Sequence, residues 1–289
     1  MSKLAIDIGP LAVPTQLVVP LICGLVAAAV GHVAGRRKHV GIVGTLLDML
    51  LAAGIAARIA FVVLWFEQYR SAPWSVLDIR DGGFTPWAGG FAAVLVALWR
   101  GWRNAALREP LALGLVAGAL GWLAAPGALR FGADPTLSDL DAIALLTPQG
   151  RPASLEALAG GKPMVVNLWA SWCPPCRREM QVLAAAQRQR ADVSFVFANQ
   201  GEDVYTLQHY LDEGKLEIAN VVLDPRKGLG QKYGSMALPT TLFYDADGRL
   251  VDTHLGALSA ASLASKLNRL QAAGAGMGLD RSRMHKQTP

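Results

Sequence analysis

Two cysteines, Cys173 and Cys176, are separated only by two prolines and lie where an apolar run ends and a helix-like run begins. The apolar run, Val165 to Trp169, is typical of a buried strand, and the helix-like run begins near Arg177. A Cys-X-X-Cys pair at a strand-to-helix junction predicts a redox site. A helix N-terminus offers unpaired N–H groups and a partial positive charge, which stabilise a thiolate, the form of cysteine that attacks disulfides.

The two cysteines are expected to have different roles. Cys173 is the predicted nucleophile, and Cys176, one turn further into the helix, is the predicted resolving thiol that attacks the mixed disulfide. A structural zinc site needs four ligands, and the only other cysteine, Cys23, lies far upstream, so we predict no metal. A static structural disulfide is the remaining alternative, which the tight spacing, the intervening prolines and the helix-start position disfavour.

The residues around this pair carry a family resemblance. The run from Val165 to Glu179 includes Trp172 and the Cys-Pro-Pro-Cys motif, and Leu-Pro-Thr-Thr-Leu-Phe follows at 238–243. Together they resemble the thioredoxin superfamily, and specifically its TlpA/ResA-like membrane-tethered branch. The resemblance covers roughly Leu137 to Leu270 in matching order. It implies an α/β thioredoxin-like fold and the activity of a protein-disulfide oxidoreductase that needs no cofactor.

The same resemblance implies a client-binding surface next to the cysteines. In this family the proline at the position of Pro239 is cis, a geometry uncommon enough to signal a specific turn. That turn would leave the backbone of Leu238 free to pair with an extended client peptide. The implied substrate-binding residues are Trp172, Pro174, Pro175, Leu238 and Pro239.

One departure from thioredoxin itself concerns the acid near the sulfurs. Thioredoxin has a buried carboxylate six residues before its first cysteine, but this chain has Asn167 there, and an amide cannot shuttle a proton. The resemblance places the glutamate of Cys-X-X-Cys-X-X-Glu near the sulfurs instead. That residue is Glu179, one helical turn from Cys176, which is close enough to influence its titration. The alternative is a solvated glutamate on the helix surface.

The composition divides the chain into two parts. It has 289 residues, of which 52% are apolar, and its mean hydropathy of +0.31 is high for a soluble protein. We predict an α-helical transmembrane domain over residues 1–130, a thioredoxin-like domain over 134–272 and a disordered tail over 273–289. Four apolar runs are the predicted membrane helices, at about 15–34, 41–66, 84–99 and 111–129, of which the third is short and glycine-rich.

Charge in the connecting segments predicts the orientation in the membrane. Arg36, Arg37 and Lys38 follow the first apolar run, and Arg100, Arg103 and Arg108 separate the third from the fourth. The loop at 67–81 is mixed in sign. Because positively charged loops face the cytoplasm, the thioredoxin-like domain is expected on the periplasmic side of a bacterial inner membrane. These clusters and a basic tail account for most of the net charge of +5, which therefore gives no case for nucleic acid.

The apolar part has a weaker resemblance of its own. Residues 56–61 and 80–90 resemble the front half of prolipoprotein diacylglyceryl transferase, but that family's functional histidine is missing, with Trp87 and Ala88 in its region. We expect a retained scaffold without the transferase reaction. Arg58 within the second apolar run is costly there, and either snorkelling or a lipid or partner contact would explain it. Asp48 and His32 are the expected candidates to neutralise it.

The rest of the second part gives a regular pattern of elements. Over 136–159, an opening strand or hairpin with its turn at 147–151 and a short helix are expected before the cysteine strand. After the cysteine helix, a strand at 193–199, a helix at 204–211 and a strand at 220–223 match the insertion of the TlpA/ResA-like branch. A hairpin over 242–254 and a helix over 259–270 complete the predicted domain.

The sequence therefore predicts a membrane-anchored extracytoplasmic thiol–disulfide oxidoreductase, in the reducing direction, with cytochrome c maturation or metal-site assembly as the implied setting. An oxidase or isomerase working in the opposite direction, a lipid-modifying transferase and a non-catalytic chaperone are the alternatives. Cys23 is the only cysteine in residues 1–130, so electron relay by thiol exchange through this part is not expected. The expected partners are protein or peptide clients, the lipid bilayer and a separate thiol electron carrier.

Overall fold

The computed structural model describes residues 5–8, 11–36, 39–70, 73–129, 136–140, 143–214, 216–234 and 236–285. The chain divides into two compact units, Val13–Gly132 and Met1–Ala12 together with Ala133–Pro289. We call the first the helical unit and the second the cysteine unit. A two-stranded sheet of β1 (Ala5–Ile8) and β2 (Leu11–Pro14) precedes the first long helix.

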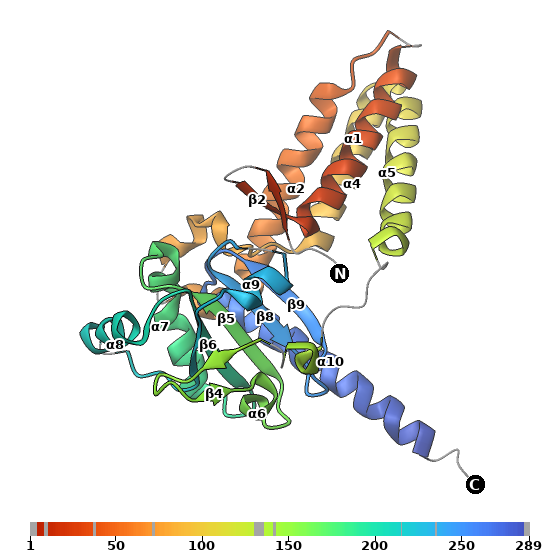
Figure 1. Ribbon diagram of the computed structural model, residues 1–289. Helices are drawn as coiled ribbons and strands as arrows, with labels where there is room; N and C mark the ends of the chain where they lie inside the picture. The colour runs from red at the N-terminus through yellow and green to blue at the C-terminus, as the bar shows by residue number, and fades with distance from the viewer. Residues whose placement is uncertain are drawn as a thin grey trace. The chain divides into compact units, whose positions relative to one another are not determined.

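The helical unit consists of long helices joined by short ones. Its elements are α1 (Thr15–Arg36), α2 (Val43–Leu64), α3 (Phe66–Arg70), η1 (Pro73–Leu77), η2 (Ile79–Asp81), α4 (Pro86–Arg103), η3 (Ala105–Leu107) and α5 (Arg108–Leu129). Helix α1 packs along α5, and α2 packs along α4 (Figure 1). Glycines permit both close approaches: a Cβ on Gly114 would lie 2.8 Å from the carbonyl oxygen of Ala27, and one on Gly89 would lie 2.9 Å from that of Ala53.

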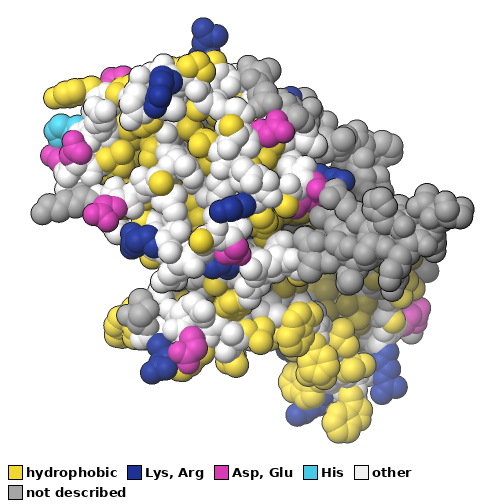
Figure 2. Space-filling model, turned by 90° about the horizontal axis from the view of Figure 1, so that it is seen from below, with side chains coloured by type: hydrophobic (Ala, Val, Ile, Leu, Met, Phe, Trp, Pro, Cys, Tyr) yellow, Lys and Arg dark blue, Asp and Glu magenta, His cyan; other side chains and the backbone are white. Residues whose placement is uncertain are grey.

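Among the described residues, three helical segments are long and apolar enough to cross a membrane: Val18–Arg36, Val43–Leu64 and Ala105–Ala124. Four spans were predicted, and the third forms α4, which is not among the three. The reason lies in its sequence, because α4 has only 18 residues and includes Arg100 and Arg103 in its last turn. Large apolar side chains are exposed along the helical unit, and hydrophobic side chains are widely visible on the molecular surface (Figure 2). Such exposure fits contact with lipid.

The cysteine unit is built on a seven-stranded sheet in the order β4-β3-β7-β6-β5-β8-β9. The central strands β5, β6 and β7 run parallel, and the remaining pairs are antiparallel. The strands are β3 (Leu145–Leu146), β4 (Pro152–Ala153), β5 (Met164–Trp169), β6 (Ser194–Gln200), β7 (Val221–Asp224), β8 (Thr240–Tyr244) and β9 (Leu250–Leu255). Every residue of β5 and β6 is buried, as expected for strands covered on both faces.

Helices cover both faces of this sheet and enclose two cores. They are α6 (Leu155–Ala159), α7 (Pro174–Gln189), α8 (Val204–Glu213), α9 (Gly228–Lys232) and α10 (Ala260–His285), preceded by η4 (Leu137–Leu140). One core gathers side chains of α7, α8 and α10 around Phe197 and Phe243, and the other gathers those of α6 and α9 around Val166 and Leu242. The predicted thioredoxin-like α/β fold is confirmed.

The element pattern predicted for this unit is also confirmed, including the β3–β4 hairpin, the helix–strand insertion of α8 and β7, and the β8–β9 hairpin. The predicted tail differs. Residues 273–285 continue α10 instead of being disordered, because a helix that is already nucleated and packed gains a hydrogen bond with each further residue. The last four residues of the predicted tail, 286–289, lie outside the described part of the chain.

Candidate active site

The cysteine pair lies at the start of α7. Cys173 is the N-cap residue of this helix, and its Sγ accepts a hydrogen bond of 3.3 Å from the backbone N–H of Cys176. Pro174 and Pro175 occupy the first two helical positions, where a missing N–H costs nothing. Cys173 and Cys176 form a disulfide with a Cα–Cα distance of 5.3 Å. The buried strand β5 leads into this turn and the helix follows, as the sequence pattern predicted.

The two sulfurs differ little in exposure in this disulfide form. Cys173 is 3% exposed and Cys176 is fully buried, with 0% exposed. The order agrees with the expectation that Cys173 is the more accessible cysteine, but both belong to the core between the sheet and α7. The assignment of Cys173 as the attacking thiol and Cys176 as the resolving thiol stays a prediction for the reduced protein.

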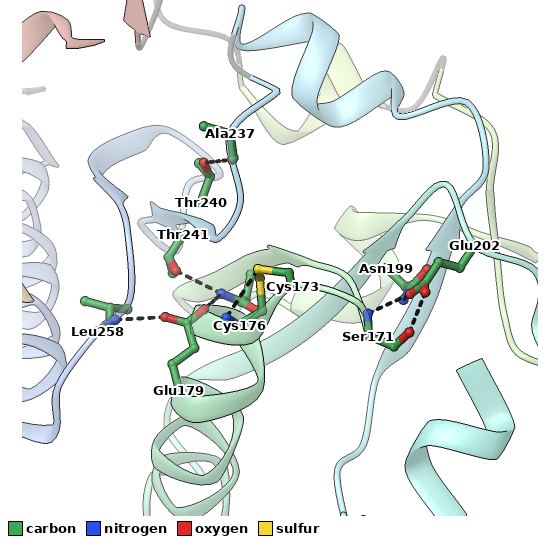
Figure 3. The surroundings of a disulfide bond; sticks show 11 residues. Ser171, Cys173, Cys176, Glu179, Asn199, Glu202, Ala237, Thr240, Thr241 and Leu258 are labelled. Carbon is green, nitrogen blue, oxygen red and sulfur yellow. Dashed lines mark hydrogen bonds between the residues drawn. A yellow bond between two sulfur atoms is a disulfide. The ribbon is translucent and has the colours of Figure 1, made fainter. Parts of the chain in front are cut away.

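Glu179 is a buried carboxyl group one turn beyond Cys176 on α7, and only 1% of it is exposed. Its Oε1 accepts a hydrogen bond of 2.7 Å from Asn167 Nδ2, and its Oε2 accepts one of 2.8 Å from the backbone N–H of Leu258 (Figure 3). Among the described ion pairs none involves Glu179. The alternative of a solvated glutamate on the helix surface is therefore wrong.

The environment of Glu179 changes its acidity. Burial removes water from the charged form and raises the pKa of Glu179 from its ordinary value of 4.5 to about 7, and the hydrogen bonds from Leu258 and Asn167 oppose this rise. A carboxyl group with a pKa near 7 can both accept and release a proton at neutral pH. Glu179 therefore has the acidity of a general acid–base group beside the cysteine pair.

Asn167 and Thr241 contribute to this site in a way that the sequence did not reveal. Asn167 Nδ2 donates a second hydrogen bond, of 3.0 Å, to Thr241 Oγ1 on the neighbouring strand β8. The two residues are direct partners in the antiparallel β5–β8 register, so their side chains lie on the same face of the sheet. The sequence shows the missing acid at position 167, but the contact with Glu179 depends on how α7 lies over the sheet.

A second polar cluster holds the segment before the cysteines. Glu202, which follows β6, accepts hydrogen bonds from the backbone N–H of Ser171 at 2.8 Å and from Ser171 Oγ and Asn199 Nδ2, both at 2.5 Å (Figure 3). The carboxyl ends of β5 and β6 lie next to each other because these strands are parallel and adjacent. The signal that could have predicted this cluster is a glutamate just after the strand that flanks the cysteine strand.

Two of the five predicted client-binding residues line a small cavity. The Leu238–Pro239 peptide bond is cis, as the resemblance implied. A cavity of about 80 Å³ is lined by Leu168, Trp172, Gln200, Lys227, Gly230, Met236 and Leu238. Trp172 is 64% exposed and Pro174 is also exposed, whereas Pro175 is half-buried and Pro239 is buried. Two of the predicted residues, Trp172 and Leu238, thus line one cavity beside the cysteine turn.

Comparison with known proteins agrees with this geometry. The Redoxin family matches residues 135–268 of the chain. The thioredoxin-like protein YneN of Bacillus subtilis is 32% identical over 130 residues, covering 43% of this chain and 74% of the relative. The thiol:disulfide interchange protein DsbE of Escherichia coli K12 is 32% identical over 153 residues, covering 50% of this chain and 80% of the relative.

The chain belongs to the thioredoxin-like thiol–disulfide oxidoreductases. A further relative, the thiol-disulfide oxidoreductase ResA of Halalkalibacterium halodurans, is 29% identical over 113 residues, covering 38% of this chain and 63% of the relative. The family match lies within the cysteine unit. The resemblance of the helical unit to prolipoprotein diacylglyceryl transferase therefore stays a prediction.

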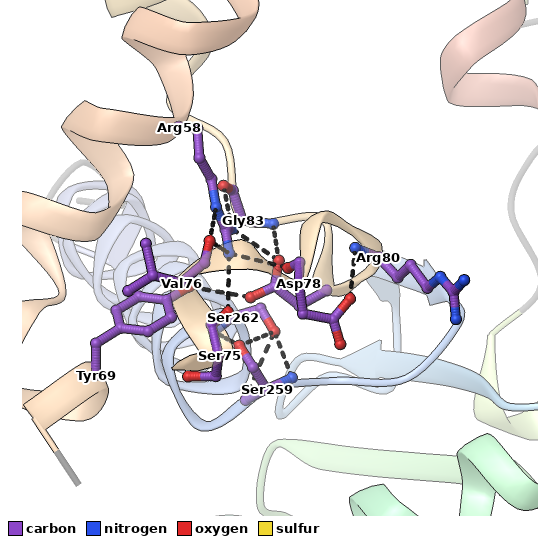
Figure 4. A network of polar contacts seen from close by, with 10 residues as sticks. Arg58, Tyr69, Ser75, Val76, Asp78, Arg80, Gly83, Ser259 and Ser262 are labelled. Carbon is purple, nitrogen blue, oxygen red and sulfur yellow. Dashed lines mark hydrogen bonds and ion pairs between the residues drawn. The ribbon is translucent and has the colours of Figure 1, made fainter. Parts of the chain in front are cut away.

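Arg58 of this thiol–disulfide oxidoreductase lies in a separate polar network, in the helical unit. Its Nη1 donates 2.8 Å hydrogen bonds to Asp81 Oδ1 and to the Gly83 carbonyl oxygen (Figure 4). Its Nε and Nη2 both donate to the Val76 carbonyl oxygen, at 3.1 and 2.9 Å. All three guanidinium nitrogens therefore have partners within the chain.

The predicted neutralising partners of Arg58 were wrong. Asp48 instead forms an ion pair with Arg100 between α2 and α4, and His32 is exposed. The observed partner, Asp81, comes from the loop between α3 and α4. Hydropathy patterns predict the helices of such a unit but not the path of a loop, so the Arg58–Asp81 pair could not be predicted from the sequence.

Proposed function

We propose that this chain is a membrane-anchored reductase of protein disulfides that acts outside the cytoplasmic membrane of a bacterium. The observation that carries the proposal is the buried Glu179, which forms no ion pair among the described residues, one turn beyond a Cys-X-X-Cys pair at a helix N-terminus. A static structural disulfide needs no titratable group beside it. A thiol that must lose its proton inside the protein does need one.

The reaction is a dithiol–disulfide exchange. The Cys173 thiolate, stabilised by the N–H groups at the start of α7, attacks one sulfur of a client disulfide, and the other client sulfur leaves as a thiolate and takes up a proton. Cys176 then transfers its proton to the Glu179 carboxylate and attacks Sγ of Cys173. This step releases the second client sulfur as a thiolate, which takes up a proton, and leaves the enzyme with the Cys173–Cys176 disulfide. The client gains two electrons, and the enzyme loses two.

Client binding is assigned to the cavity beside the cysteine turn. Trp172 and Met236 are exposed and apolar, and Lys227 adds a cation to the same lining. A volume of about 80 Å³ is close to that of a few methylene groups, so one small apolar side chain of a client fits there. We propose that a client segment next to its cysteine occupies this cavity, with Leu238 and Pro239 bordering the extended peptide and Pro174 and Pro175 bordering the sulfurs.

The direction of exchange is tested by the reduction potential of the Cys173–Cys176 pair. The full chain in detergent is equilibrated with thiol–disulfide buffers of known potential, and the two cysteines are alkylated and counted by mass. A potential near that of thioredoxin, about −270 mV, is the result we expect of a reductase. A potential near that of DsbA, about −120 mV, would assign the oxidising direction instead.

Orientation in the membrane is a separate part of the proposal. The connection after α1 and the turn between α4 and α5 are rich in Arg and Lys, which supports a cytoplasmic location for both. The cysteine unit would then be periplasmic. Protease added to intact spheroplasts should digest the cysteine unit, whereas the same unit in inside-out vesicles should be protected. Protection in spheroplasts would contradict this orientation.

Reducing equivalents are proposed to come from another protein. Relay by thiol exchange needs two cysteines that alternate between dithiol and disulfide, and Cys23 is the only cysteine in the sequence of the helical unit. A Cys23→Ser variant should therefore be as active as the wild type in cells. The chain alone in sealed proteoliposomes should not pass electrons from thioredoxin on one side to the Cys173–Cys176 disulfide on the other. Transfer under those conditions would contradict the proposal.

A further inference from the structure

The side-chain amide of Asn167 is committed to two partners, both of which receive its N–H groups. Nδ2 donates to Glu179 Oε1 at 2.7 Å and to Thr241 Oγ1 at 3.0 Å. Asn167 is 1% exposed, and its Oδ1 has no hydrogen-bond partner among the described residues. Turning the amide over would bring Oδ1 against Glu179 Oε1, which is favourable only if a proton lies between the two oxygens. The observed orientation is therefore the one that suits an ionised Glu179.

Both carboxyl oxygens of Glu179 face N–H donors. Oε1 receives the Asn167 amide, and Oε2 receives the backbone N–H of Leu258. Protonation would weaken these hydrogen bonds, because a neutral carboxyl group is a weaker acceptor than a carboxylate. Burial favours the neutral carboxyl group, and these two donors favour the carboxylate. The Leu258 donor belongs to the main chain, so Asn167 is the side chain by which the sequence can alter this balance.

We propose that Asn167 is a positioning residue that sets the balance between the ionised and the protonated forms of Glu179. The inference rests on the proposed role of Glu179 for its effect on exchange, but not for its effect on the carboxyl group itself. Thr241 supports the arrangement by holding the second N–H of the amide, which fixes the first N–H toward Glu179. The unpartnered Oδ1 is the acceptor that a protonated Glu179 would need if the amide turned over.

Other charged or titratable groups near this face of the sheet lie on α7, β9 and α10. Cys173 and Cys176 lie on α7 itself. His254 on β9 is the register partner of Thr241, so its side chain lies on the same face. Lys266 on α10 lies over the Phe243 ring and pairs with Asp252 at 2.9 Å. Of the groups around Glu179, only the donors of Asn167 and Leu258 make described hydrogen bonds to its carboxyl oxygens.

The test measures the Glu179 carboxyl group directly in the oxidised full chain, in which neither Cys173 nor Cys176 titrates. The infrared C=O band of the protonated carboxyl group is followed against pH, and the spectrum of Glu179→Gln is subtracted. The wild-type midpoint is expected near pH 7. Asn167→Leu removes a hydrogen bond to a charged group, so its midpoint should rise by about one to two pH units. An unshifted midpoint would overturn the inference.

Three further variants make the result specific. Thr241→Val frees one amide N–H and should raise the midpoint by less than Asn167→Leu does. Leu155→Ala, in the core on the other face of the sheet, should lower stability without moving the midpoint. If Asn167→Leu does not fold, Asn167→Asp replaces the donor by a second carboxyl group of similar size. The pair should then titrate in two steps, the upper one above the wild-type midpoint, and a single unshifted step would overturn the inference.

The exchange rate is measured on the same variants and separates this inference from the proposed function. If the midpoint of the Glu179 titration rises in Asn167→Leu and the pH–rate profile shifts to higher pH by the same amount, both the inference and the proposed function hold. If the midpoint rises and the profile does not, Asn167 still sets the ionisation of Glu179, and it is the proposed role of Glu179 in exchange that fails. The control Leu155→Ala shows how much of any rate change comes from lost stability alone.

Discussion

Two of the buried carboxyl groups, those of Asp81 and Glu179, are held in contrasting ways. Asp81 in the helical unit lies 2.8 Å from the Arg58 guanidinium, and both side chains are almost fully buried. The Tyr69 hydroxyl and the backbone N–H of Gly83 also donate hydrogen bonds to this carboxylate. Glu179 in the cysteine unit has the same degree of burial and two good hydrogen bonds, but its donors are the uncharged Asn167 and Leu258 N–H groups.

The difference teaches how burial separates structural acids from reactive ones. A cation next to a buried carboxylate compensates for the lost water and keeps the pair charged, so Arg58 and Asp81 fasten a loop to a helix. At Glu179 the two neutral donors compensate only in part, and the pKa of Glu179 rises to about 7 because burial prevails. Glu179 can therefore exchange protons at the pH at which thiols react.

The largest expected effect concerns where the chemistry is located. Cys173→Ser should lower the rate of exchange with a peptide disulfide by about a thousandfold or more, because the attacking sulfur is gone. Cys23→Ser, in the helical unit, should leave the rate unchanged. Stopped-flow fluorescence of a quenched peptide disulfide measures both. Substantial activity in Cys173→Ser would show that Cys173 is not the nucleophile and would contradict the assignment of the chemistry to the cysteine unit.

Removing the cation that pairs with Asp81 should lower the stability of the helical unit. Arg58→Met leaves Asp81 buried and unpaired, which should cost about 3–5 kcal/mol. The double variant Arg58→Met, Asp81→Leu should recover much of this loss, because no charge is then left behind. Thermal unfolding in detergent compares the three proteins, and exchange at the cysteines should stay at the wild-type rate. A single variant as stable as the double one would show that the ion pair is not structural.

Glu179, which forms no ion pair among the described residues, should instead make the stability of the folded chain depend on pH. The folded-state pKa of Glu179, about 7, lies above its ordinary value of 4.5, so its contribution is fully present below pH 4.5 and is lost as pH rises to 7. The wild type should lose about 3 kcal/mol over this interval relative to Glu179→Gln. Hydrogen exchange of β5 and β6 amides in the oxidised full chain measures it. Parallel pH curves for the two proteins would contradict the account.

The smallest effect concerns client binding. Trp172→Ala removes an exposed apolar wall of the cavity beside the cysteines and should lower kcat/KM for a peptide disulfide about 5- to 30-fold. A small disulfide that does not fill the cavity should be affected much less. Tyr205→Ala is the matched control, because Tyr205 is a 78% exposed aromatic residue that does not line this cavity. Equal losses in the two variants would argue against a specific client site.

Much of the cysteine unit could be predicted because its signals are local. The run of buried strand residues, the Cys-X-X-Cys pair and the helix after it are contiguous, and the cis Leu238–Pro239 bond follows a motif of the family. The burial of Glu179 was also within reach. Cys176, Glu179, Met180 and Leu183 repeat at the spacing of one helix face, and all four are buried.

What could not be predicted depends on contacts between distant segments. Asn167 meets Thr241 only in one register of β5 and β8, and a sequence does not state a register. Arg58 meets Asp81 only because a loop folds back over the end of α2. The third predicted membrane span, α4, is less apolar than the other long helices of its unit for a different reason, since its terminal arginines lower the hydropathy of a short helix.

The most direct test of the central claim is to trap the reaction intermediate. In Cys176→Ser the resolving thiol is absent, so a client disulfide attacked by Cys173 should remain attached through a mixed disulfide. Digestion and mass spectrometry of the reduced full chain after mixing with a peptide disulfide should find the peptide on Cys173, and Cys173→Ser should trap little or none. The opposite result would contradict the account. In that result the Cys173→Ser variant carries the peptide on Cys176, and the Cys176→Ser variant carries none on Cys173, so the two roles would be reversed.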